Sequence, residues 1–134
     1  MRSTKRERDY ARMGSIQNAL DISSQDLMAL LRIGRALHRW NERECGIDNG
    51  CIKRDETTGI PYWLNSHTMR RTRIPDREKG AQKALAAIMA RYPTLRAYQQ
   101  SDPRGCALYV LRPGDVPEGQ DTDAYYSRGV AVCL

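Results

Sequence analysis

The sequence predicts one α+β domain in which two main amphipathic helices pack on a three-stranded antiparallel sheet. Three observations predict this class: apolar residues at helical spacing in the first two thirds, alternating apolar residues after residue 93, and short Gly/Pro-rich turns between the later segments. A chain of 134 residues has the size of one domain and can bury roughly 65–70% of the surface of its unfolded form. Because the chain contains no Phe, aliphatic residues, Tyr and Trp must fill the core.

The first main helix is predicted over residues 24–45. Ser23 or Ser24 can cap it, Asp26 suits the positive end of the helix dipole, and Gly46 suits a left-handed C-terminal cap. Residues at helical spacing predict its buried side: Leu27, Leu30, Leu31, Gly34, Leu37 and Asn41.

The second main helix is predicted between Pro75 and Pro93. Proline suits the first turn of a helix, and a second proline stops it. The alanines in its apolar stripe predict a close approach to a neighbouring element. The stripe consists of Ala81, Ala84, Leu85, Ile88 and Tyr92.

The strands are predicted mainly in the last third. "TLRAYQQ", "CALYVLR" and "YYSRGVAVCL" are separated by turns and form a meander, because short connections make neighbours in sequence neighbours in the sheet. Residues 46–74 contain two turn signals. They form either a short hairpin of "CIKRD" and "IPYWLN" or a functional loop.

Residues 1–22 are polar and arginine-rich, and we expect them to form a basic N-terminal arm ahead of a domain over residues 23–134. We expect this arm to be a frayed or short helix that becomes ordered when it binds a partner. The start of the chain lacks the apolar stretch of a secretory signal, and no segment approaches a membrane span. Four widely spaced cysteines then predict free thiols in a reducing cytoplasm.

The net charge of +6 is unevenly distributed, with 18 Lys/Arg and 11 Asp/Glu in residues 1–93. Such asymmetry is compatible with a polyanionic partner such as DNA or RNA. Four arginines fall within an arc of roughly 80° on the first main helix, with no carboxylate inside the arc. They are either an ordinary solvated face or a binding surface for an anionic partner, and they are Arg32, Arg35, Arg39 and Arg43.

A second basic cluster surrounds the start of the second main helix. Three arginines precede the helix, and two lysines four residues apart share one of its faces. The cluster consists of Arg70, Arg71, Arg73, Lys79 and Lys83. The sequence leaves open whether the two clusters merge into one patch.

No motif for catalysis or cofactor binding is present: there is no G-x-S-x-G, no P-loop and no dinucleotide fingerprint. His38, Cys45, Cys51 and His67 are potential zinc ligands, but none forms the tight pair typical of structural sites. The sequence therefore predicts no catalytic residue, no cofactor and no metal. We expect Trp40 and Trp63 in the core.

The segment "DPRGCALYVLRPGDVPEG", followed by "YYSRGVAVC", resembles a family of small accessory proteins encoded by bacteriophages and prophages. "CIKRDETTGIPYW" and "PDREKGAQKALAAIMARYPTLRAY" resemble earlier segments of the same family, so that the resemblance covers roughly residues 36–133. It implies expression in the cytoplasm of a bacterial host and an action on host machinery. It carries over no catalytic residue.

These observations together predict a phage-type accessory protein that acts by stoichiometric binding to a host nucleoprotein or to nucleic acid, for example as a counter-defence or host-takeover inhibitor. The two basic clusters would supply the contacts. The alternative is an inhibitor or regulator that binds protein alone. A small enzyme or a zinc-binding module is a third class.

Overall fold

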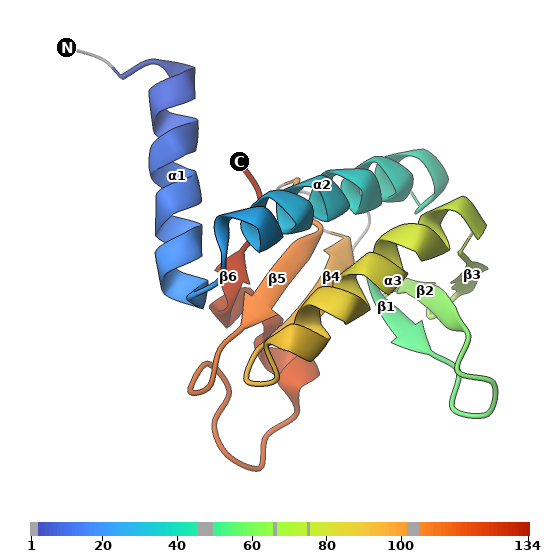
Figure 1. The fold of residues 1–134 in the computed structure, drawn as a ribbon. Coiled ribbons are helices and arrows are strands. Elements are labelled where there is room, and N and C mark those ends of the chain that lie inside the picture. The colour runs from blue at the N-terminus through green and yellow to red at the C-terminus, as the bar shows by residue number, and fades with distance from the viewer. Residues whose placement is uncertain (1–2, 46–49, 66, 75, 102–104) are drawn as a thin grey trace.

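The computed structural model describes residues 3–45, 50–65, 67–74, 76–101 and 105–134. Within these residues the fold is α+β, as predicted, with three α-helices and one antiparallel sheet (Figure 1). The helices are α1 (Lys5–Leu20), α2 (Ser24–Trp40) and α3 (Asp76–Arg91). The strands are β1 (Gly50–Arg54), β2 (Pro61–Asn65), β3 (Arg71–Arg73), β4 (Arg96–Ser101), β5 (Leu108–Leu111) and β6 (Val130–Ala131).

The prediction of a three-stranded sheet was wrong, because the sheet has six strands in the order β3-β2-β1-β4-β5-β6. The predicted meander forms one half of the sheet, β4 to β6. The possible hairpin is confirmed as β1 and β2, and β3 pairs with β2 to complete the other half. The halves join where Gly50 pairs with Ser101 and Cys51 pairs with Gln100. This long-range pairing has no local signal in the sequence.

The third predicted strand, residues 125–134, is largely absent. Residues Thr122–Arg128 form a 3-10 helix, η2, and only Val130–Ala131 pair as β6. The Tyr126 ring stacks on Tyr98 at a centroid distance of 5.2 Å and meets Tyr109 edge-on at 5.3 Å. These aromatic contacts hold the segment against a face of the sheet, where it cannot continue as a strand.

Helix α2 begins as predicted, since the side chain of Ser23 accepts a hydrogen bond from the Asp26 backbone N–H at 3.1 Å. It ends earlier than predicted, at Trp40, and residues Asn41–Cys45 continue as a π-helical turn, η1. Gly46, the predicted cap, lies outside the described residues. The predicted buried side is confirmed, from Leu27 through Asn41.

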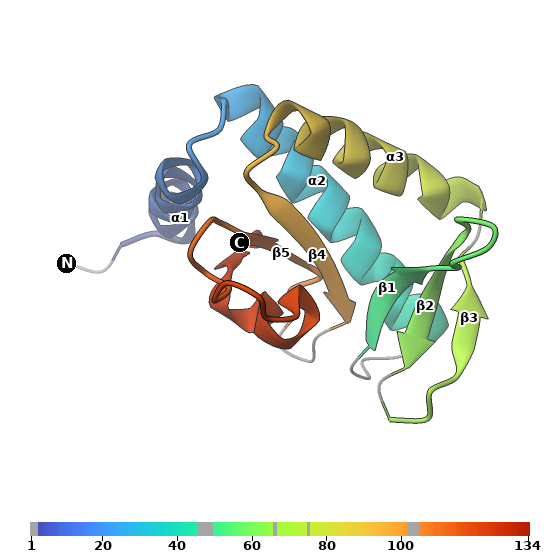
Figure 2. The ribbon, with the colours of Figure 1, turned by 90° about the horizontal axis from the view of Figure 1, so that it is seen from below.

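Helix α3 lies beside α2 and runs in the opposite direction (Figures 1 and 2). At its C-terminal end, Arg91 and Tyr92 both donate to the Asp26 carboxylate near the start of α2, each at 2.5 Å. Of the predicted stripe, Leu85 and Ile88 are buried, but Ala84 is exposed. The helix is rotated so that Gln82 is buried instead.

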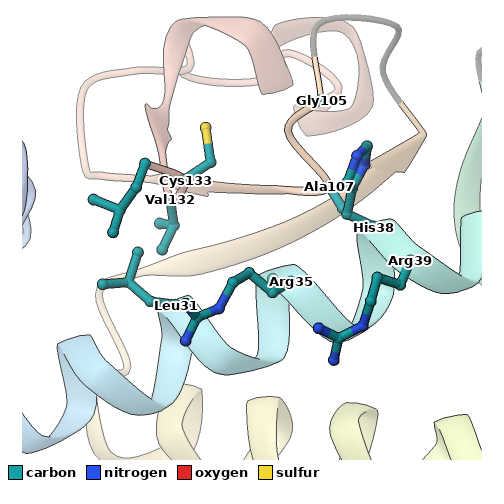
Figure 3. Close-up of a pocket in the computed structure, with 10 residues that line it drawn as sticks. Leu31, Arg35, His38, Arg39, Gly105, Ala107, Val132 and Cys133 are labelled. Atoms are coloured by element: carbon teal, nitrogen blue, oxygen red, sulfur yellow. The ribbon is translucent and has the colours of Figure 1, made fainter. Parts of the chain in front are cut away.

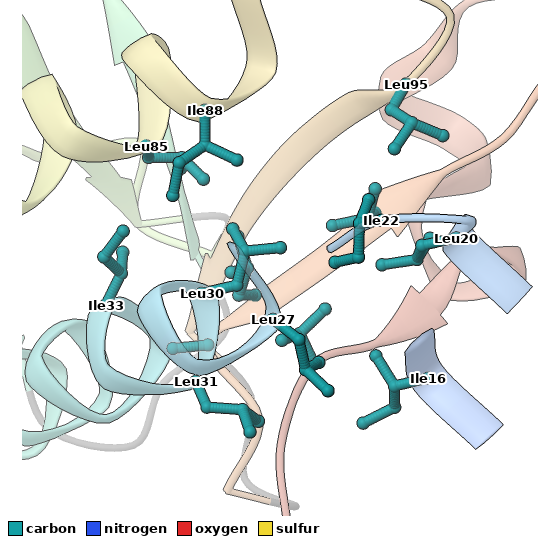
Figure 4. Packing of buried hydrophobic residues seen from close by; sticks show 14 of the residues in the cluster. Ile16, Leu20, Ile22, Leu27, Leu30, Leu31, Ile33, Leu85, Ile88 and Leu95 are labelled. Atoms are coloured by element: carbon teal, nitrogen blue, oxygen red, sulfur yellow. The ribbon is translucent and has the colours of Figure 1, made fainter. Parts of the chain in front are cut away.

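The main core lies between the two antiparallel helices and one face of the sheet. Figure 4 shows side chains of this cluster, with Leu30 and Ile33 of α2 facing the region of Leu85 and Ile88 of α3. A second, smaller cluster consists of Trp40, Trp63 and Ile74, which confirms that both tryptophans belong to the core.

The strand register divides the sheet into a helix-covered face and an opposite face. Trp63 packs with Trp40 of α2, so its neighbour Tyr62 points to the opposite face. Ala97 and Val110 join the main core, so Tyr98 and Tyr109 also point to the opposite face, where η2 covers them.

Helix α1 is the element expected to be a frayed or short helix, and it has 16 residues. Thr4 caps it by accepting a hydrogen bond from the Glu7 backbone N–H, and Ile16 and Leu20 enter the core. The Arg12 guanidinium donates to the Ala131 carbonyl at 3.0 Å, so α1 also covers the open edge of β6. In the part of the chain that the structure describes, no helix has the length and apolar character to cross a membrane.

Candidate anion-binding site

The four arginines of the first predicted cluster, Arg32, Arg35, Arg39 and Arg43, are all exposed, and we call them the arginine row. The first three lie on α2, on the side opposite its buried residues, and therefore point away from the sheet. The fourth lies in η1, where a π-helical turn replaces the α-helix that the predicted arc assumed. The row thus follows the outer side of α2 and continues into the next turn.

Among the described residues, Arg32, Arg35 and Arg39 have no carboxylate within ion-pair distance. The nearest acid in sequence, Glu42, lies against His38 instead, with Oε1 at 2.8 Å from the imidazole Nε2. Exposed guanidinium groups in this arrangement favour an anionic partner, because each can donate two hydrogen bonds to one phosphate or carboxylate group.

A pocket of about 280 Å³ opens beside the row, between α2 and the end of the chain (Figure 3). Arg35 and Arg39 belong to both the row and the pocket lining. In Figure 3 they extend from the same side of α2, and His38 reaches toward Gly105. The lining residues are Leu31, Gly34, Arg35, His38, Arg39, Gly105, Ala107, Val132, Cys133 and Leu134.

Two glycines lie in the walls of this pocket, one at a close approach and one at a left-handed backbone position. A Cβ atom on Gly34 would lie 3.1 Å from the Val132 carbonyl oxygen, so a side chain here would crowd the end of the chain where it lies against α2. Gly105 has a positive φ of 89°, a backbone conformation that favours glycine, and it lies beside the His38 ring. The pocket is therefore a product of backbone packing between distant parts of the chain.

The second predicted cluster does not merge with the row. Thr72 pairs with Trp63 and shares its helix-covered face, so Arg71 and Arg73 point to the opposite face of the sheet. There the Arg71 guanidinium lies 4.5 Å from the centre of the Tyr62 ring. Arg70, just before β3, is also exposed.

The two lysines of that cluster belong to α3. Lys83 is exposed and lies in the same layer of helices as α2, whereas the side chain of Lys79 lies outside the described part of the structure. The structure therefore divides the predicted binding residues between two sides of the molecule.

A small enzyme would need acid or base side chains in a cavity, and the candidates among the described residues are Asp55, Glu56 and His67. Asp55 accepts hydrogen bonds from the backbone N–H groups of Thr57 and Thr58 in a turn. These bonds lower the pKa of its carboxyl group, and the bond from Thr58 has the larger effect. Glu56 and His67 are exposed, and neither lines the pocket.

Metal binding has no support in the described residues, which contain no group of three His, Cys, Asp or Glu side chains that could hold an ion. Of the four residues considered as zinc ligands, His38 lies on α2 and His67 in the turn after β2. The side chains of Cys45 and Cys51 fall outside the described part.

Comparison with known proteins gave no match to a family model, to a curated protein or to a solved structure.

Sequence reasoning missed the pocket and the role of His38 and Cys133 in lining it. His38 is three residues after Arg35, so its position beside the row could have been read from helical spacing. Cys133 and Val132 carry no such signal, because they reach α2 only through the folding of the sheet.

Proposed function

We propose that this protein acts by stoichiometric binding to nucleic acid, either bare or within a host nucleoprotein, and that the arginine row is its contact surface. The observation that carries the proposal is the row itself: exposed arginines along one side of α2, three of which have no ion-pair partner among the described residues. A phosphate backbone offers regularly spaced anions to such a surface.

The resemblance to phage and prophage accessory proteins supports the same proposal. A counter-defence or host-takeover inhibitor needs a rigid surface and a few strong contacts, and it needs no cofactor. Helix α2 provides this rigidity, because its opposite side is fixed in the core by residues from Leu27 to Trp40. An inhibitor that contacts only protein is the competing function.

The test is fluorescence anisotropy of labelled single- and double-stranded oligonucleotides with the full chain. If the row contacts three or four phosphates of a duplex, affinity should fall roughly 40- to 150-fold between about 50 and about 200 mM salt. Reversing the row with Arg32→Glu, Arg35→Glu and Arg39→Glu should abolish binding and leave the circular dichroism spectrum unchanged.

The matched control reverses two arginines of the opposite sheet face, Arg71→Glu and Arg73→Glu. This variant should retain most of the affinity, because these side chains lie on the other side of the molecule. Equal losses in the two variants would contradict the assignment to the row. Absence of binding at low salt would leave the protein-only inhibitor as the better function.

A further inference from the structure

We infer that the pocket beside the arginine row binds a single nucleotide unit, with its phosphate on Arg35 and Arg39 and its base against the apolar wall. This inference rests on the proposed function, since it specifies what the binding surface does at one position.

The position of the pocket is the first step. Arg35 and Arg39 are one helical turn apart, are exposed, and line the pocket as well as forming part of the row. A phosphate group held by both arginines would lie on the outer side of α2, next to the pocket that both residues line. Whatever is attached to that phosphate can enter it.

The lining of the pocket has a cationic side and an apolar side. Leu31, Ala107 and Val132 are buried residues that give the pocket a rigid apolar wall, fixed by the main core. Inorganic phosphate would use only the guanidinium groups. A ligand that uses the whole lining needs an anionic group joined to a body with an apolar surface, and a nucleotide joins a phosphate to a flat base with apolar faces.

The size is the third step. At about 280 Å³ the cavity lies just below the range of roughly 300–1,000 Å³ typical of pockets for small organic molecules. A cavity of this size has room for a base. The rest of a strand would continue outside, along Arg32 on the same side of α2.

The reactivity of the Cys133 thiol can report whether a nucleotide occupies the pocket. It is half-buried and lines the pocket, whereas Cys106 is buried and does not line it. A bound nucleotide would shield the Cys133 thiol from iodoacetamide. Peptide mapping by mass spectrometry reads the alkylation of each cysteine separately, with Cys106 as the internal control.

The experiment compares adenosine 5′-monophosphate, adenosine and inorganic phosphate as protecting probes on the full chain. We expect the nucleotide to protect Cys133 at concentrations at least about tenfold lower than either fragment, because only the nucleotide uses both sides of the lining. Equal protection by inorganic phosphate, equal protection by adenosine, or no protection at millimolar nucleotide would each overturn the inference.

A matched pair of variants separates the pocket from the row. Arg35→Ala should raise the protecting concentration of the nucleotide about tenfold or more, because a hydrogen-bonded charge contact is lost. Arg32→Ala, on the same exposed side of α2 but outside the lining, should change it less than about twofold. Equal effects of the two variants would also overturn the inference.

The oligonucleotide assay keeps the two proposals distinguishable. Row-dependent binding of oligonucleotides without nucleotide protection of Cys133 supports the proposed function and rejects the pocket. Protection that depends on Arg35, without oligonucleotide binding, rejects the nucleic-acid function and keeps a nucleotide site.

Discussion

Removing the hydroxyl group of Tyr92 should weaken the attachment of α3 to the start of α2. The hydroxyl donates to Asp26 Oδ2 at 2.5 Å and accepts from the Ser23 backbone N–H at 3.2 Å, and Tyr92→Phe abolishes both bonds. Arg91 also pairs with Asp26, but its side chain is 56% exposed, so water screens that contact and it cannot replace the lost bond.

The expected cost follows from the burial of the acceptor. The Asp26 side chain is only 13% exposed, so water replaces the lost donor incompletely. A hydrogen bond to a charged group contributes about 1.5–3 kcal/mol, and we expect Tyr92→Phe to lower the free energy of unfolding by about 2 kcal/mol near neutral pH.

The cost should depend on pH with a definite sign. The hydrogen bond from Tyr92, followed by the one from Arg91, lowers the pKa of the Asp26 carboxyl group below its ordinary value of 3.8. Its contribution to stability is therefore fully present above that value and is lost as the pH falls through the lower pKa of the folded state. The difference between wild type and Tyr92→Phe should accordingly shrink in acid.

Urea denaturation followed by circular dichroism, at about pH 7 and at about pH 3, measures both quantities. Tyr10→Phe is the matched control, because Tyr10 is 59% exposed and its hydroxyl has no partner among the described residues. The control should change stability little at either pH. A Tyr92→Phe deficit below about 0.5 kcal/mol, or one that does not shrink in acid, would contradict a stabilising bond from Tyr92 to the ionised Asp26 carboxylate.

Three further substitutions test the packing by the same denaturation assay. Gly80→Ala should stabilise α3 by about 1 kcal/mol, since a Cβ atom there meets no atom within 4 Å. Gly34→Ala should not stabilise the protein, because its Cβ atom would lie 3.1 Å from the Val132 carbonyl oxygen. Equal gains in the two variants would contradict the close approach at Gly34. Gln82→Met should stabilise by about 1 kcal/mol, because the buried amide has no hydrogen-bond partner among the described residues, and destabilisation would reveal one. Trp63→Ala should cost about 3–5 kcal/mol, and a loss below about 1 kcal/mol would place Trp63 outside the core.

The parts of the fold that follow local rules could be predicted. Ser23 caps α2, and the buried side from Leu27 to Asn41 was identified from spacing alone, because helix geometry fixes which residues share a side. The exposure of Arg32, Arg35 and Arg39 followed from the same geometry. Even here, the change to a π-helical turn before Arg43 had no signal in the spacing.

In the candidate site, too, some features follow from local helix geometry and others from the tertiary fold. Helical spacing was enough to predict that arginines gather on one side of a helix, because residues three and four apart in a helix are neighbours whatever surrounds them. The position of Arg71 and Arg73 on the opposite face follows from the fold, since it depends on the pairing of β2 with β3 and on Trp63 packing with Trp40. The pocket likewise needs Val132 to reach Gly34 across almost a hundred residues of chain. Such contacts depend on the packing of the whole molecule, and no local pattern of residues encodes them.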